Sequence, residues 1–186
     1  MTLRRPATVH VCGLRHVPEM AARTGARYLV SAIDAALQPP TPGSIPAHLH
    51  LKLDMHDIVE EQVGQTPPAA EHVRRLIEFV HDWDGRGPLL VHCFAGISRS
   101  TAAAFTTLCA LNPETPEEHI ALAIRRSSDT ALPNRRFVAF ADQALRREGR
   151  MIAALAKMGQ HRAAYECVPF QIEGIDDGKA GASRAA

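Results

Sequence analysis

Apolar positions along this chain follow strand-like patterns at first and mainly helical ones later. Apolar runs, or alternating apolar and polar positions, predict strands over residues 7–12, 27–32, 48–55 and 88–91. Apolar residues three and four positions apart predict helices over residues 18–24, 68–83, 100–111, 115–124 and 137–145. Strands alternating with helices, followed by helices alone, predict an α/β fold. We expect a central, mainly parallel sheet flanked by helices, and a helical C-terminal half.

The length of 186 residues predicts one compact domain with a substantial core. The periodic pattern weakens from Gly159, so we predict a domain over residues 1–158 and a C-terminal extension over residues 159–186, partly docked or loosely ordered. Within the extension, residues 165–172 contain enough apolar side chains to dock on the domain. Residues 174–186 are rich in Gly, Ala, Asp and Ser and predict a loosely ordered tail.

Composition excludes several function classes. A net charge of +1 and a pI near 7.8 provide no general attraction to nucleic acid or to a membrane surface. Residues 1–6 lack an apolar core of signal-peptide length, and the longest apolar runs are too short to span a bilayer, so we expect a soluble cytoplasmic protein. Four cysteines without short paired spacing predict neither a disulfide framework nor a zinc site.

The candidate reactive residues of the chain lie mainly in residues 91–101, Val-His-Cys-Phe-Ala-Gly-Ile-Ser-Arg-Ser-Thr. They join the strand predicted over 88–91 to the helix predicted over 100–111, so Cys93 lies where a strand turns into a helix. A cysteine and an arginine at this spacing arise easily by chance. Requiring also the flanking His, Gly and Ser lowers the chance expectation to on the order of 10⁻⁴.

These residue types suit a phosphate site. Backbone amides from Phe94 to Arg99 can form an anion-binding nest, with Ala95 and Gly96 small enough for a tight curl, and the following helix adds the positive end of its dipole. Arg99 offers a planar, two-pronged donor to phosphate oxygens. The same positive surroundings favour a thiolate at Cys93, which makes it the candidate nucleophile. The predicted phosphate-binding residues are Phe94, Ala95, Gly96, Ile97, Ser98 and Arg99.

The segment resembles the signature loop of the cysteine-dependent protein tyrosine phosphatases, and its form His-Cys-x-Ala-Gly-x-Ser-Arg-Ser is most like the dual-specificity branch. Residues 132–137, Leu-Pro-Asn-Arg-Arg-Phe, resemble the Ser-Pro-Asn-x-x-Phe segment of the same branch. With the Leu-x-Met-His-Asp-Ile stretch at residues 53–58, the combination is most similar to small predicted tyrosine phosphatases of bacteria. The resemblance spans most of residues 7–148.

The resemblance implies a phosphatase fold and hydrolysis of phosphomonoesters through a phosphocysteine, with no metal and no cofactor. Ser100 would hydrogen-bond the sulfur of Cys93 and assist its departure. His92 would orient the loop, and the family's asparagine, here Asn134, would brace it, although Asn134 can equally cap the helix that follows.

The family also uses an upstream aspartate as general acid, and two candidates occur in residues 51–58. Asp54 lies on the polar face of the predicted strand, whereas Asp57 lies just past its end, where an acid loop would begin. Asp57 is also 36 residues before Cys93 (93 − 57), nearer the family's usual interval than the 39 of Asp54. We favour Asp57, with Asp54 as the alternative. The alternative for Asp57 is a purely structural role, in which its side chain caps a turn.

The resemblance predicts a phosphatase of protein phosphotyrosine, with dual specificity as a variant. A related alternative is a phosphatase of inositol phosphates, phosphoinositides or RNA 5′ ends, which the absence of lysine from the loop disfavours. An alternative of another class is a catalytically silent phosphate-binding module. Arg135 and Arg136 either select acidic substrates at the rim of the site or form a solvated helix face.

Overall fold

The computed structural model describes residues 8–83, 85 and 87–172. Its centre is one sheet of the strands β1 (Val9–Gly13), β2 (Tyr28–Ile33), β3 (His50–Asp54), β4 (Leu89–Cys93) and β5 (Phe170–Ile172). The order across the sheet is β3-β2-β4-β1-β5, with the first four strands parallel and β5 antiparallel to β1. The predicted mainly parallel sheet is thus confirmed, while β5 was not predicted. Residue 7 of the first predicted strand and the predicted tail over 174–186 lie outside the described residues.

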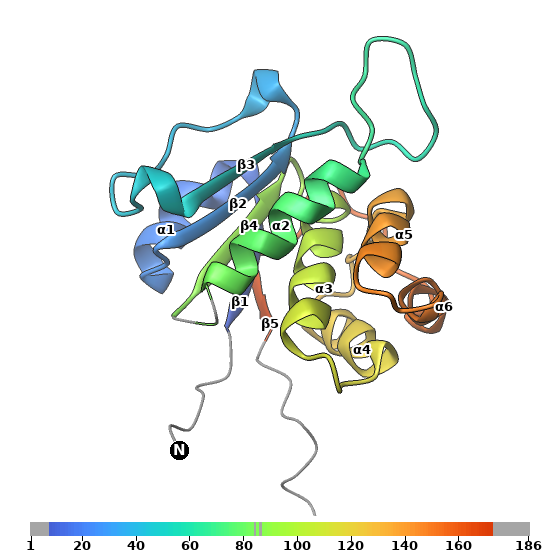
Figure 1. Cartoon of the computed structure of the whole chain (residues 1–186). Coiled ribbons are helices and arrows are strands. Elements are labelled where there is room, and N and C mark those ends of the chain that lie inside the picture. Colours follow the sequence, from blue (N-terminus) through green and yellow to red (C-terminus); the bar gives the residue numbers. More distant parts are fainter. Residues whose placement is uncertain (1–7, 84, 86, 173–186) are drawn as a thin grey trace, which may run out of the picture.

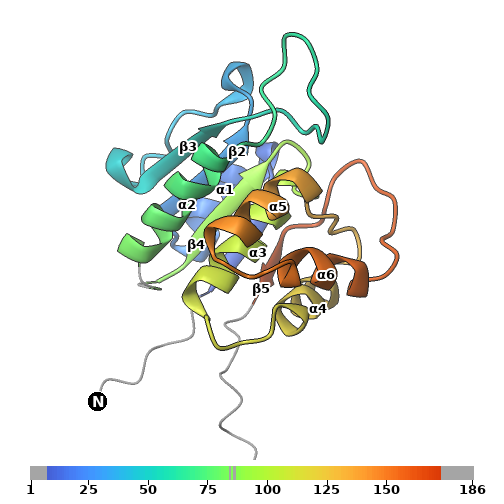
Figure 2. The same cartoon turned by 45° about the vertical axis from the view of Figure 1, so that its right-hand side comes forward.

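Helices cover both faces of this sheet, as predicted (Figure 1). They are α1 (Val17–Thr24), α2 (Ala70–Trp83), α3 (Arg99–Leu111), α4 (Glu117–Ser127), α5 (Arg135–Ala144) and α6 (Arg150–Lys157), with short 3-10 helices η1 (Leu14–His16), η2 (Ala35–Leu37) and η3 (Ala47–Leu49). Figure 2 shows α2 to α6 gathered on one face and α1 on the other. The sequence pattern did not predict α6. No helix in the described part of the chain is both long and apolar enough to cross a bilayer.

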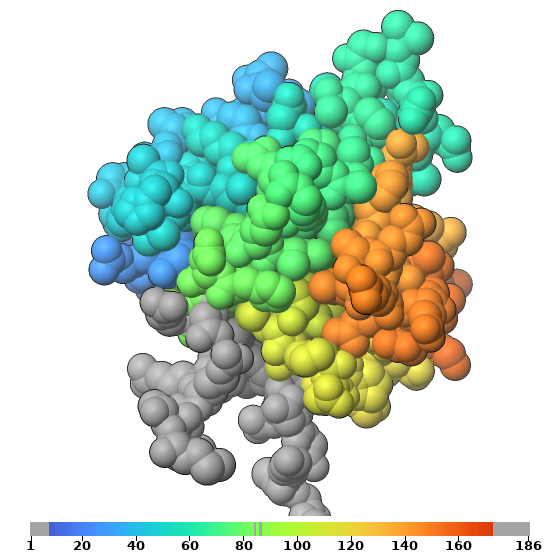
Figure 3. Space-filling view, in the orientation of Figure 1, coloured from blue at the N-terminus to red at the C-terminus, as the bar shows by residue number. Residues whose placement is uncertain are grey.

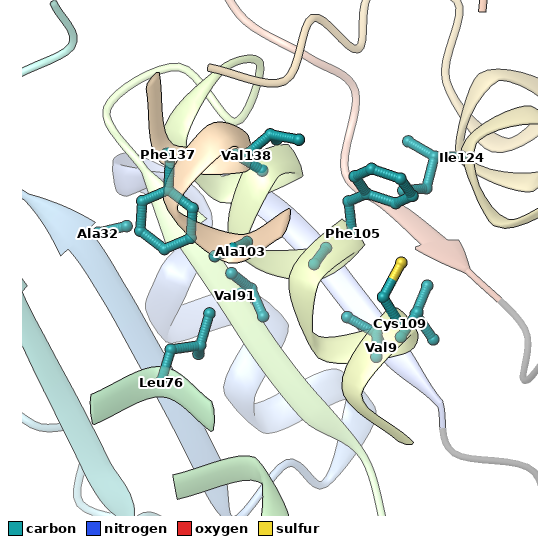
Figure 4. Close-up of a cluster of buried hydrophobic side chains, with 14 of the residues drawn as sticks. Val9, Ala32, Leu76, Val91, Ala103, Phe105, Cys109, Ile124, Phe137 and Val138 are labelled. Atoms are coloured by element: carbon teal, nitrogen blue, oxygen red, sulfur yellow. The ribbon is translucent and has the colours of Figure 1, made fainter. Parts of the chain in front are cut away.

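The unequal helix layers give two cores of unequal size. On the larger side, α3 lies against the sheet because its surface is rich in small and apolar residues, and Phe105 and Phe137 are fully buried there. Figure 4 shows Phe137 of α5 beside Ala103 of α3 and Val91 of β4. The smaller core is formed by α1 against the opposite face of β1, β2 and β4. The sheet is therefore buried on both faces, as parallel sheets generally are.

The register of the strands decides what lies near the predicted loop. All four parallel strands end at the same edge of the sheet, where ligands bind in open α/β sheets. Gly13 at the end of β1 is the partner of Cys93, and Ser31 of β2 is the partner of His92. The loop that follows Cys93 is thus bordered by the ends of β1 and β2.

Candidate active site

The loop from β4 to α3 curls at Gly96, whose backbone has a φ of +72°. A Cβ atom built at this position would lie 2.7 Å from the backbone carbon of Cys12 and 2.8 Å from the amide nitrogen of Gly13. Backbone atoms cannot yield to such an approach, so both the conformation and the close packing on β1 require glycine.

The side chain of Cys93 lies inside this curl. The residue is 1% exposed, its Sγ accepts a hydrogen bond of 3.2 Å from the Gly96 amide, and it lies 3.2 Å from Ser100 Oγ. The structure therefore brings together the predicted nucleophile and the hydroxyl that the resemblance assigns to it.

The other three cysteines are also buried. Burial raises the pKa of the Cys12 and Cys109 thiols, and it raises the pKa of Cys167 to about 12. These three side chains therefore remain thiols near neutral pH and are poor nucleophiles.

The loop presents unused donors. Among the described residues, no acceptor receives a hydrogen bond from the backbone amides of residues 94, 95, 97, 98 and 99. Arg99 is only 6% exposed; its Nη1 donates to the Met55 carbonyl at 2.8 Å, whereas its buried Nε has no hydrogen-bond partner. A buried donor without an acceptor costs about 1–3 kcal/mol, and a bound oxyanion removes that cost. This arrangement suits phosphate.

Asp57 lies beside the loop. Its Oδ1 accepts hydrogen bonds from Ser98 Oγ at 2.6 Å and from Asn134 Nδ2 at 2.9 Å, and its Oδ2 lies 3.9 Å from Arg99 Nε. The Asp57 side chain remains 38% exposed, so a substrate can reach it. Asp54 instead accepts a hydrogen bond from the backbone amide of Ala35 at 2.7 Å. Of the two predicted candidates, the structure brings Asp57 to Arg99 and gives Asp54 a role in the β2–β3 connection.

Asn134 both caps the helix α5 and holds neighbouring parts of the site in place. Its Oδ1 accepts from the Phe137 amide at 3.1 Å, which caps α5, while its Nδ2 donates to Asp57. Its backbone amide donates to the Ser98 carbonyl at 3.2 Å. The side chain thus holds the candidate acid and the backbone holds the loop after β4, so both roles that the sequence left open for Asn134 have contacts in the structure.

His92 begins a buried chain of hydrogen bonds behind the loop. Its Nδ1 lies 3.0 Å from the Cys93 carbonyl and its Nε2 lies 2.6 Å from Ser31 Oγ. Ser31 Oγ also lies 2.7 Å from His50 Nε2, and His50 Nδ1 lies 2.8 Å from Thr41 Oγ1. The sequence predicted His92 as an orienting residue but gave no signal for the other three, because they are distant along the chain.

When both histidines are neutral, the groups in this network of hydrogen bonds determine the direction of each bond. The Cys93 carbonyl can only accept, so His92 Nδ1 carries a proton and its Nε2 accepts from the hydroxyl of Ser31. Ser31 has one proton, so its oxygen accepts from His50 Nε2, and His50 Nδ1 accepts from Thr41. Both histidines are neutral in this arrangement. Burial lowers the pKa of each to about 4, with Lys52 also lowering that of His50.

Arg136 holds the segment that carries Asp57. Its Nε donates to the Pro68 carbonyl at 2.8 Å, its Nη1 donates to the Val59 carbonyl at 3.1 Å, and its Nη2 lies 3.2 Å from Glu61 Oε1. Figure 3 shows this segment, in teal, projecting next to α5 in orange. Arg136 therefore ties α5 to the segment that follows Asp57, a contact that the sequence did not predict, whereas Arg135 is exposed.

Metal ligands were not predicted. Within the residues that the structure describes, no three His, Cys, Asp or Glu side chains are grouped to hold a metal ion.

Comparison with known proteins agrees with this site. A model of the protein-tyrosine phosphatase family matches residues 61–128, which include the whole loop but less than half of the chain. No curated protein sequence matches.

Solved structures match far more of the chain. A crystal structure of DUSP15 is 20% identical and has a TM-score of 0.61, covering 85% of this chain and 94% of that one. Human DUSP28 is 18% identical with a TM-score of 0.59, covering 80% of this chain and 99% of that one. PTPMT1 in complex with PI(5)P is 14% identical with a TM-score of 0.59, covering 78% of this chain and 94% of that one. At these identities the likeness shows a shared fold, and the predicted phosphatase fold is confirmed.

Proposed function

We propose that this protein is a cysteine-dependent phosphatase that hydrolyses phosphomonoesters, with phosphotyrosine in proteins as its main substrate and dual specificity as a variant. One observation carries the proposal: the loop that holds the buried Sγ of Cys93 also holds a buried guanidinium whose Nε has no hydrogen-bond partner among the described residues. A nucleophile and an anion-binding donor thus converge on one small site. The family match over residues 61–128 supports the same chemistry.

In the first step the Cys93 thiolate attacks phosphorus, an S–P bond forms, and the P–O bond to the substrate breaks. Arg99 and the unused loop amides hold the phosphoryl oxygens, whose charge is spread over the transition state. Asp57 gives its proton to the leaving oxygen. The bonds from Ser98 and Asn134 to Oδ1 leave Oδ2 on the side of Arg99.

In the second step water attacks the phosphorus of the phosphocysteine, and the Asp57 carboxylate takes a proton from that water. The S–P bond breaks, and the sulfur departs as a thiolate. Ser100 Oγ, 3.2 Å from Sγ, donates a hydrogen bond to the departing sulfur. Phosphate is released and the free enzyme is restored.

The substrate class is argued from the loop's side chains. No side chain of the loop other than Arg99 carries a positive charge, since the others include Phe94, Ala95, Ile97 and Ser98. The loop therefore offers no second cation to the additional phosphates of an inositol ring. Because the structure of PTPMT1 contains PI(5)P, inositol phosphates are the comparison substrates of choice.

The proposal is tested with p-nitrophenyl phosphate in the presence of a metal chelator. We expect hydrolysis by the wild type, loss of turnover in Cys93→Ser, and retained turnover in the control Cys109→Ala, whose cysteine lies in the core. A trapped, acid-stable phosphoryl adduct on Cys93 would support the two-step route. A strict metal requirement, or full activity of Cys93→Ser, contradicts the mechanism. Phosphopeptide binding without turnover by the wild type identifies a silent module instead.

A further inference from the structure

A groove adjoins the phosphate loop on the side of the C-terminal segment. It has a volume of about 420 Å³ and is lined by Leu14, Arg15, Phe94, Ala95, Tyr165 and Glu166. Phe94 and Ala95 belong to both the groove and the loop, so the groove is continuous with the proposed phosphate site. Its volume lies within the ordinary range of ligand sites.

Three segments that are distant in the sequence form the walls, and hydrogen bonds fix them to each other. The Leu14 amide donates to the Phe94 carbonyl at 2.9 Å, and the Cys167 amide donates to the Ala95 carbonyl at 2.9 Å. An ion pair of 2.6 Å joins Arg15 Nε to Glu166 Oε2. The groove is therefore preformed, which lowers the entropic cost of binding.

The lining selects an apolar occupant. Phe94 is 57% exposed and Tyr165 is fully exposed, so two aromatic side chains of the lining face solvent. Arg15 is the one cation among the six lining residues, and it is already paired with Glu166. An anionic headgroup would find no unpaired charge here, whereas an apolar side chain would gain contact with both rings.

We propose that this groove binds a large apolar side chain of a peptide substrate, one or two positions from the phosphorylated residue. Neighbouring residues of an extended peptide are about 3.3–3.6 Å apart, so such a side chain reaches the groove when the phosphoryl group occupies the loop. The inference rests on the proposed phosphatase function. It assigns substrate selection to Tyr165, in the C-terminal segment, whose docking the sequence predicted without a function.

The test compares two phosphotyrosine peptides that are identical except for leucine or glycine at the flanking positions. We expect wild-type kcat/KM to favour the leucine peptide by about tenfold, the usual effect of burying one such side chain. In Tyr165→Ala this ratio should fall to about two or less. Val168→Ala is the matched control, because Val168 is exposed in the same segment but does not line the groove, and it should keep the wild-type ratio.

Equal kcat/KM for the two peptides, or an unchanged ratio in Tyr165→Ala, overturns the inference while leaving the phosphatase proposal intact. Faster hydrolysis of inositol phosphates than of either peptide also overturns it. If no phosphoester is hydrolysed, the phosphatase proposal fails instead. The ratio of peptide Kd values for Cys93→Ser then still tests the groove, because binding needs no turnover.

Discussion

Replacing Ser31 by alanine tests the chain of hydrogen bonds behind the phosphate loop. The change removes one hydroxyl that is fully buried and lies within 2.7 Å of a ring nitrogen of both His92 and His50. Each ring nitrogen then loses the hydrogen-bond partner that it has in the structure, and both histidines are buried. An unsatisfied buried polar group costs about 1–3 kcal/mol, so the two together destabilise the fold by about 2–6 kcal/mol.

For a protein of this length, 1 kcal/mol corresponds to roughly 2–4 °C in Tm. We therefore expect Ser31→Ala to lower Tm by roughly 4–24 °C. The matched control is Thr41→Val, which keeps side-chain shape and removes only the outer bond of the chain, to His50 Nδ1. Since Thr41 is partly exposed, water can replace its hydroxyl, and the loss should stay below about 1 kcal/mol.

The functional part of this prediction concerns His92, because its ring donates to the Cys93 carbonyl only while Nδ1 carries a proton. Without Ser31 the ring is free to take the other tautomer, which withdraws that donor from the loop. The kcat for p-nitrophenyl phosphate in folded Ser31→Ala should fall about tenfold, with Thr41→Val within twofold of wild type. A Tm and a kcat for Ser31→Ala that both match the wild type would refute the reasoning.

Three further predictions follow from the site. Asp57→Asn should lower kcat at least a hundredfold for poor leaving groups and remove the limb of the pH profile that needs the protonated acid, whereas Asp54→Asn should keep both; the opposite result would make Asp54 the acid. Gly96→Ala should destabilise by about 3 kcal/mol or more in thermal unfolding, since the new Cβ meets the backbone of β1; a wild-type Tm would show that the loop can shift. The pKa of His92 and His50 is lowered to about 4 in the folded state, so the unfolded chain binds more protons between about pH 4 and 6.5, and stability should fall as the pH drops through that window. Denaturant midpoints that stay constant from pH 7 to 4.5 would contradict this.

The sequence was most informative where the chemistry is local. Cys93, Arg99 and the glycine of the loop lie within seven residues, so one strand-to-helix junction predicts their meeting. Asp57 was harder, because strand alternation and interval only favoured it over Asp54. The hydrogen bonds from Ser98 and Asn134 distinguish the two, and these come from segments 41 and 77 residues away.

Contacts that depend on packing could not be predicted in the same way. Arg136 looked like a rim or surface residue, because nothing in its neighbourhood shows that α5 meets the carbonyls of Val59 and Pro68. Ser31 and His50 looked like ordinary strand residues, because only the pairing of β2 with both β4 and β3 brings them behind His92. The short strand β5 has too few residues for a periodic pattern to be visible.

The position of β1 has a consequence for how the chain is assembled. It is the first strand of the described residues, yet its neighbours in the sheet are β4 and β5. Val9 pairs with Leu89, which is 80 residues later (89 − 9), and with Ile172, which is 163 residues later (172 − 9). The chain loses the entropy of closing these long loops before the strand contacts stabilise it, and this slows folding. Because Gly13 of β1 and Cys167, which precedes β5, both pack against Gly96, we expect the surroundings of Cys93 to form late in folding, after β5 has been synthesised.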